Sequence, residues 1–172
     1  THPIDARLAE LGLTLPDAPA PAANYVPFVA AGGLVYVSGQ ISQGPNGLIK
    51  GKLGETLSTE QGAEAARTCA LSLLAQARAA CGGDFSRLKR VVKLTGFVNC
   101  TPDFTEQPKV VNGASDLLVE IFGDAGRHAR SAVAAPSSRG PWAGARTPST
   151  HARSCCRSSS TNPRQRSRNS SG

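Results

Sequence analysis

Residues 26–40, VPFVAAGGLVYVSGQ, decide the fold of the N-terminal half of the chain. Two apolar runs flank Gly32-Gly33, and two-residue glycine loops of this kind join antiparallel strands because glycine accepts the positive φ angles of a tight hairpin turn. The sequence therefore predicts a β-hairpin whose second strand ends near Ser38-Gly39. Residues 40–54, rich in glycine, predict a long loop after the hairpin.

Beyond this loop the pattern changes to that of alternating helices and strands. Ser58 and Gln61 have the spacing of a capping box, and the apolar positions from 63 to 77 then follow a helical period that ends at Gly82-Gly83. Residues 87–99 are rich in β-branched side chains and predict a long strand.

A second helix is predicted over residues 110–122, where apolar side chains recur on one face until Gly123. A further strand begins at about His128 and ends near Val133. At the N-terminus, Ile4, Leu8 and Leu11 share one face of a short helix, which a Pro/Ala linker follows.

This order predicts an α+β fold, a two-layer sandwich in which two helices cover one face of a mixed β-sheet. The strands carry apolar side chains on both faces, so the face without helices also needs cover. We therefore expect the chain to associate with itself.

The last 39 residues differ sharply from the rest. Residues 1–133 hold 12 Lys and Arg against 12 Asp and Glu, whereas residues 134–172 hold seven Arg and no acid, which gives the net charge of +7. Trp142 is the one large apolar side chain after Val133. Such a segment has little to bury against the entropy lost on ordering. We expect one domain over residues 1–133, with residues 1–14 as an N-terminal helix extension, and a disordered tail over residues 134–172.

The composition also bears on the compartment. Cys69, Cys81 and Cys100 lie in apolar runs without a disulfide rhythm, no run approaches the length of a membrane span, and the first residues have no apolar signal core. These features favour a soluble protein of the reducing cytoplasm.

Five segments, taken in order, resemble the RidA/YjgF family, also labelled endoribonuclease L-PSP. They are ANYVPFV (23–29), LVYVSGQIS (34–42), VVKLTGFVNCTPDF (91–104), VVNGASDLLVEIFG (110–123) and HARSAV (128–133). The resemblance covers roughly residues 15–133. It implies a chorismate-mutase-like fold, assembled as a homotrimer with ligand clefts between subunits.

The resemblance also implies an activity and a site. The activity is the hydrolysis of enamines and imines to 2-keto acids and ammonia, of the 2-iminobutanoate/2-iminopropanoate deaminase type, without a metal or cofactor. The positions that correspond to family ligand residues are Tyr25, Ser38, Gly39, Asn112 and Arg130, and Arg130 is the candidate catalytic residue.

An arginine suits this chemistry because its guanidinium fork can hold both oxygens of a substrate carboxylate, which fixes the neighbouring imine carbon for attack by water. Backbone groups near Gly39 could orient that water, because glycine permits close approach. Many relatives carry a cysteine two residues after the arginine, and Ala132 stands there in this chain, so a thiolate mechanism is not expected.

Each candidate also has a structural explanation. Arg130 could be a surface residue at the start of a strand, Tyr25 a packing aromatic, Ser38-Gly39 a bend, and Asn112 a support for its neighbouring loop. His128 has no second histidine or carboxylate at a fixed spacing, so an acid/base pair is not visible.

The resemblance stops at Val133. The family continues through a turn into a final strand with an acid that helps to position the catalytic water, whereas AAPSSRGPWAGARTPST follows here. A shifted reading frame would explain the change, because suitable synonymous codons for residues 135–139 read as Ala-Glu-Leu-Pro out of frame. Without that strand we expect reduced stability, or substitute pairing by part of the tail.

The missing acid leaves three functions open. The first is imine or enamine hydrolysis with Arg130 as the carboxylate clamp. The second is a non-catalytic module that binds small carboxylates, and the third is an endoribonuclease that inhibits translation. Nucleic acid is otherwise expected to bind only nonspecifically, through the arginines of the tail.

Overall fold

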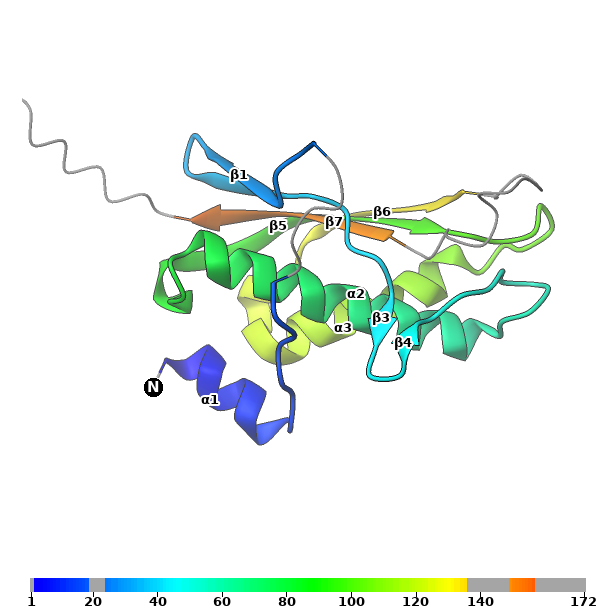
Figure 1. The fold of residues 1–172 in the computed structure, drawn as a ribbon, viewed down its shortest axis with the longest axis horizontal. Helices are drawn as coiled ribbons and strands as arrows, with labels where there is room; N and C mark the ends of the chain where they lie inside the picture. The colour runs from blue at the N-terminus through cyan, green and yellow to red at the C-terminus, as the bar shows by residue number, and fades with distance from the viewer. Residues whose placement is uncertain (1, 19–23, 136–148, 157–172) are drawn as a thin grey trace, which may run out of the picture.

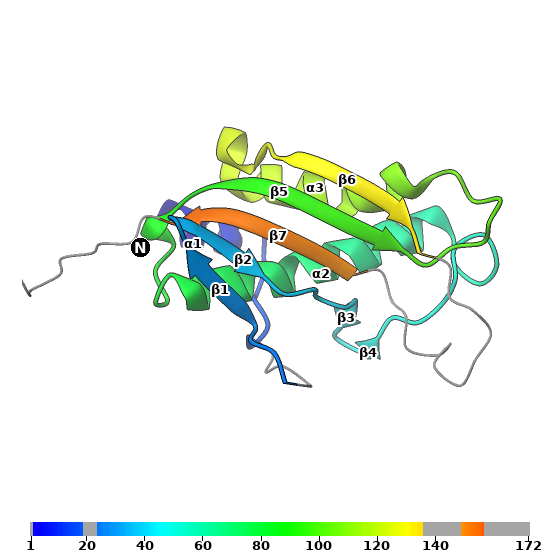
Figure 2. The ribbon, with the colours of Figure 1, turned by 90° about the horizontal axis from the view of Figure 1, so that it is seen from above.

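The computed structural model describes residues 2–18, 24–135 and 149–156. Its centre is a five-stranded mixed sheet of order β1-β2-β7-β5-β6 (Figure 2). The strands are β1 (Phe28–Ala31), β2 (Leu34–Val37), β5 (Leu88–Val98), β6 (Ala129–Ala134) and β7 (Ser149–Cys156). β5 pairs in parallel with β6 and antiparallel with β7.

Two long helices cover one face of this sheet (Figure 1). They are α2 (Thr59–Ala80) and α3 (Gln107–Phe122), and the short α1 (Pro3–Glu10) lies beyond them, where Arg7 Nε donates a hydrogen bond to the carbonyl of Glu120. The α+β class and the two-helix layer predicted from the sequence are confirmed.

The local signals in the sequence are also confirmed. β1 and β2 form an antiparallel hairpin in which Ala31 pairs with Leu34, and Gly32 and Gly33 have φ angles of 58° and 76°. The capping box at the start of α2 is complete, because Ser58 Oγ accepts from the Gln61 amide while Gln61 Oε1 accepts from the Ser58 amide.

The core lies between the sheet and the two helices. Its fully buried side chains come from β2, β5, α2 and α3 and include Val35, Leu73, Leu94, Val98, Val110, Leu117 and Leu118. Cys69, Cys81 and Cys100 are buried as well, as expected of small apolar side chains. None of the helices in the described residues is long and apolar enough to cross a membrane.

The segment predicted as a loop over residues 40–54 contains a small hairpin of β3 (Gln43–Gly44) and β4 (Gly47–Leu48). The prediction of an irregular segment is wrong here, because Pro45-Asn46 and the positive φ of Gly47 turn the chain back on itself.

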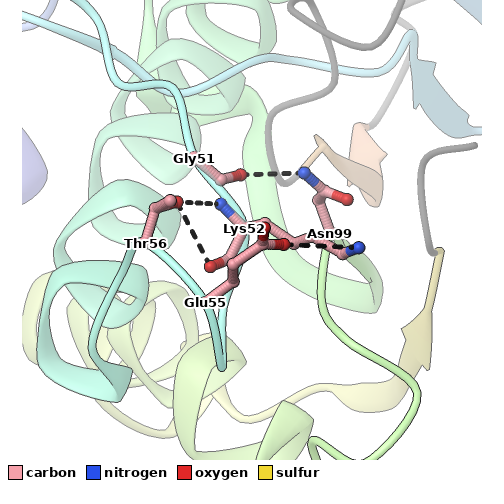
Figure 3. A network of polar contacts seen from close by, with 5 residues as sticks. All are labelled: Gly51, Lys52, Glu55, Thr56 and Asn99. Atoms are coloured by element: carbon pink, nitrogen blue, oxygen red, sulfur yellow. Dashed lines mark hydrogen bonds and ion pairs between the residues drawn. The ribbon is translucent and has the colours of Figure 1, made fainter. Parts of the chain in front are cut away.

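A polar network fixes the rest of this loop to the end of β5 (Figure 3). Asn99 Nδ2 donates to the Gly51 carbonyl at 2.8 Å, and the Leu53 amide donates to the Asn99 carbonyl at 3.0 Å. The Lys52 amide donates to Thr56 Oγ1 at 2.8 Å. These bonds join the loop to residue 99 and to its own next turn, so the loop leads into α2 in one defined path.

β7 differs from the expectation of a disordered tail and agrees with the alternative, pairing by part of the tail. Ser149–Cys156 belongs to the segment expected to be disordered, yet it forms a strand between β2 and β5, in the interior of the sheet and not at an edge. Pairing of this kind uses backbone groups and requires no particular side chains. The rest of the predicted tail, residues 136–148 and 157–172, lies outside the described residues, and the division of the chain at Val133 stays a prediction.

Candidate functional site

Arg130 lies on β6, the edge strand of the sheet, opposite Leu94 of β5. Its side chain reaches toward α3, where Nη1 donates to Asn112 Oδ1 at 2.7 Å and to Ser115 Oγ at 3.2 Å. Both hydrogens of Nη1 are therefore used, and the guanidinium is held in one orientation although the residue is exposed.

His128 extends these contacts. Ser115 Oγ lies 3.1 Å from His128 Nε2, and His128 Nδ1 lies 2.6 Å from the carbonyl oxygen of Gly126. Asn112, Ser115, His128 and Arg130 thus form one connected set between α3 and β6, which we call the α3–β6 network.

The electrostatics of the network follow from its half-buried position. Burial of the imidazole lowers the pKa of His128, the hydrogen bond to the Gly126 carbonyl opposes this effect, and the positive charge of Arg130 lowers the pKa further. The net shift is downward, so the neutral imidazole is favoured.

Two glycines bring the backbone close enough to build the network. A Cβ on Gly113 would overlap the Ala63 carbonyl of α2, and a Cβ on Gly126 would overlap the Leu118 carbonyl of α3. Close packing at Gly113 fixes α3 beside α2, and hence the position of Asn112. Close packing at Gly126 places the carbonyl that holds His128.

Replacing Gly126 with alanine is expected to destabilise the protein by about 1–3 kcal/mol, because the new methyl group meets backbone that has no room to move. Chemical denaturation measures this change. G44A is the matched control, because a Cβ there makes only ordinary contacts, with Ile49 and the Gly47 carbonyl, and its effect is expected to stay within about 0.5 kcal/mol. Equal effects of the two substitutions would show that the contact at Gly126 is not tight.

The other candidates lie around the end of β2. Ser38 Oγ donates to the Val26 carbonyl at 2.6 Å, and the Ser38 amide donates to the Pro27 carbonyl at 2.9 Å. These bonds tie the end of β2 to the residues next to Tyr25. The Tyr25 side chain is 51% exposed, so it does not pack in the core of the single chain. Gly39 follows directly and is half-buried.

The chain therefore brings together Arg130 and Asn112, and separately Tyr25, Ser38 and Gly39, but not the two groups with each other. Strands β7 and β5 lie between β2 and β6. At the usual spacing of strands, this separates the two groups by roughly 14 Å. Figure 2 shows β1 and β6 at opposite edges of the sheet.

A cavity of about 110 Å³ lies at the β1–β2 hairpin and is lined by residues 30–35, Ala80 and Arg87. None of the predicted site residues lines this cavity. Within the residues that the structure describes, no three His, Cys, Asp or Glu side chains gather as a metal site would require.

The sequence interpretation did not single out Ser115, and it set His128 aside because no acid/base partner was visible. Ser115 lies three residues after Asn112 on the same face of a helix, and His128 lies two residues before Arg130 on a strand, so both share a face with a recognised candidate. These spacings were the sequence signal that could have identified the two residues as neighbours of Asn112 and Arg130.

Comparisons with known proteins agree with the fold and with the sequence motifs. A family model described as "YjgF/chorismate_mutase-like, putative endoribonuclease" matches residues 5–139. The protein TCP17 of Trypanosoma cruzi is 51% identical over 132 residues, which cover 76% of this chain and 82% of that protein.

Two solved structures are also similar over most of their length. The protein Atu1372 of Agrobacterium tumefaciens, described as a protein with unknown function, is 41% identical with a TM-score of 0.78, and the match covers 90% of this chain and 94% of that one. A "putative endoribonuclease" of Shewanella oneidensis is 35% identical with a TM-score of 0.80, and the match covers 88% of this chain and 97% of that one.

Proposed function

The chain belongs to the YjgF/chorismate mutase-like family, and on this premise we propose that it hydrolyses 2-imino acids and their enamine tautomers to 2-keto acids and ammonia. The carboxylate of the substrate is held by Arg130. The observation that carries the proposal is that Arg130 Nη1 donates both of its hydrogens to Asn112 and Ser115 of α3, which fixes the orientation of the guanidinium.

This commitment leaves one edge of Arg130 for a ligand. A guanidinium has five N–H donors, and the two on Nη1 go to Asn112 and Ser115. In the described part of the chain, no hydrogen bond is found for Nε or Nη2. These two nitrogens form the parallel pair of donors that matches the two oxygens of a carboxylate.

The reaction needs little beyond this grip. Water adds to the imine carbon, the C=N double bond becomes a single bond, and the resulting carbinolamine releases ammonia to leave the 2-keto acid. Fixing the carboxylate places the imine carbon and so contributes through orientation. The family's final strand supplies an acid for the water, whereas residues 149–156 contain neither Asp nor Glu, so we expect slow turnover.

We propose further that copies of the chain complete the cleft for one another. The Arg130 edge and the Tyr25 edge lie on opposite sides of the sheet, so a contact that joins them is head-to-tail. Head-to-tail contacts form a closed ring when the rotation between subunits closes, and the proposed ring has three subunits. Val29, Tyr36 and Val133 are large apolar side chains that stay exposed in the single chain, in support of such burial. The molecular mass in solution tests this, and a monomer would contradict it.

The activity is tested by generating 2-iminopropanoate with an amino-acid oxidase and trapping it with semicarbazide. A hydrolase removes the imine before it is trapped, so the yield of semicarbazone is expected to fall with the amount of protein added. Binding of pyruvate without any effect on the yield would instead indicate a module that binds carboxylates without catalysis. If the protein neither lowers the semicarbazone yield nor binds pyruvate, the proposal is wrong.

Hydrolysis of RNA is the second candidate, favoured by the description of the family model and the name of the Shewanella relative. The seven arginines after residue 133 will bind RNA through its phosphates, and this binding weakens as salt rises. Cleavage assays on the full chain over increasing salt separate the two effects. Cleavage that persists when binding by the arginines is screened would favour a nuclease site.

A further inference from the structure

In each hydrogen bond of the α3–β6 network, the donor and the acceptor can be assigned. The Gly126 carbonyl can only accept a hydrogen bond, so the His128 nitrogen beside it, Nδ1, must carry a proton. In the neutral imidazole Nε2 is then bare and accepts from Ser115 Oγ. Ser115 has one hydroxyl hydrogen, which this contact uses, so its oxygen accepts from Arg130 Nη1.

Protonation of His128 changes this assignment of donors and acceptors. Nε2 then becomes a donor, so Ser115 Oγ faces two donors, one from the imidazolium and one from the guanidinium, and both carry positive charge. The hydroxyl hydrogen loses its acceptor. The two like charges that donate to the same oxygen repel each other, which weakens the hydrogen bond between Ser115 and Arg130 and leaves Asn112 as the main partner of the guanidinium.

The charged groups around His128 do not offset this change. On η2 (Gly123–Gly126) and after it, Asp124 pairs with Arg127, and Arg90 of β5 donates to the Arg127 carbonyl. Lys93 of β5 donates to Ser131 Oγ on β6, and Asp116 of α3, next to Ser115, is exposed. Arg130 is the charged side chain that acts on His128, and it disfavours the imidazolium.

We propose that Ser115 and His128 are positioning residues for Arg130, and that neutral His128 is the state in which the guanidinium is set to bind a carboxylate. The proposal rests on the proposed function for its ligand, but the assignment of donors and acceptors in the network does not depend on any ligand. It adds a regulation by pH, in which acid loosens the grip of Arg130 on its ligand.

The first test needs no ligand. Nitrogen NMR of the full chain is expected to show neutral His128 with a proton on Nδ1 and none on Nε2, and the Ser115→Ala variant is expected to speed the exchange of the Arg130 side-chain N–H with water. A proton on Nε2 in the neutral state, or unchanged Arg130 exchange in S115A, would overturn the proposal whether or not any carboxylate binds.

The second test is a titration with pyruvate, whose carboxylate (pKa ~3) stays ionised from pH 8 to pH 5. Affinity is expected to fall about five-fold as pH drops through the pKa of His128 measured by NMR. S115A and H128A are expected to lose about five-fold at pH 8. H128Q, whose side-chain oxygen can accept from Ser115 but does not titrate, is expected to restore the affinity and to remove the pH dependence.

Stability sets the range of this titration. The pKa of His128 is lowered in the folded protein, whereas in the unfolded chain the imidazole takes up its proton near pH 6.5. Acidification from about pH 6.5 down to the pKa of folded His128 therefore lowers the stability of the fold. Circular dichroism at each pH confirms that the protein stays folded. Tight pyruvate binding that ignores S115A, H128A and pH would overturn the positioning role and leave the proposed function intact. No binding to the wild type, together with an unchanged semicarbazone yield, would overturn the proposed function, and the NMR result alone would then decide the positioning role.

Discussion

Truncation of the chain after Ala135 is expected to leave a protein that does not fold stably, because it removes β7 from the interior of the sheet. β7 pairs with eight residues of β5 and three of β2. Backbone hydrogen bonds contribute on the order of 1 kcal/mol each. Their combined loss is comparable with the 5–15 kcal/mol that stabilises a typical domain.

The truncation also creates two new edges. β2 and β5 would both present unpaired backbone groups, and open edges of this kind pair with other chains and aggregate. We therefore expect low solubility and loss of the cooperative thermal transition in the truncated protein, as measured by circular dichroism and light scattering.

The matched control is truncation after Cys156, which keeps β7 and removes only residues 157–172. Its melting temperature is expected to lie within a few degrees of that of the full chain. If the protein truncated after Ala135 melted at the same temperature as this control, β7 would not contribute to the stability of the sheet.

Arg130→Ala is expected to lower both pyruvate affinity and kcat/KM for 2-iminopropanoate by about 100-fold. A charged hydrogen bond contributes about 1.5–3 kcal/mol, and the Nε and Nη2 edge offers two of them to one carboxylate. A loss of 2.7 kcal/mol corresponds to about 100-fold in binding or rate. R130K keeps the charge but has no planar fork, so we expect an intermediate loss.

Arg127→Ala provides the control for charge. Arg127 is three residues away, its side chain is 72% exposed, and it pairs with Asp124 outside the α3–β6 network. The substitution removes the same charge and is expected to change affinity less than two-fold, because exposed charges act weakly at a distance. Equal losses in R127A and R130A would reduce the role of Arg130 to general electrostatic attraction.

The parts of the fold that the sequence predicts are those set by local chemistry. Gly32-Gly33 requires a tight hairpin, and Ser58 with Gln61 caps a helix, whatever the rest of the chain does. β7 could not be predicted in this way. Residues 149–156 have no Val, Ile, Leu or Phe, and their strand forms by backbone pairing with partners more than 50 residues away.

The candidate site shows the same limit. The motif identified Arg130 and Asn112 as ligand positions, and the structure places them in contact at 2.7 Å, while their role at a ligand stays a prediction. The spacing of Ser115 and His128 from Asn112 and Arg130 places each on the face of a candidate, but their contact depends on the close approach of Gly126 to α3, which no local pattern encodes. The separation of Tyr25 from Arg130 follows from the order of the strands, and this too is a non-local property.

The most direct measurement of the central claim is a crystal structure of the full chain with pyruvate bound. We predict that the two carboxylate oxygens accept hydrogen bonds from Nε and Nη2 of Arg130, while Nη1 stays on Asn112 and Ser115. Pyruvate bound elsewhere, with the Arg130 fork facing open solvent in the assembled protein, would contradict the account.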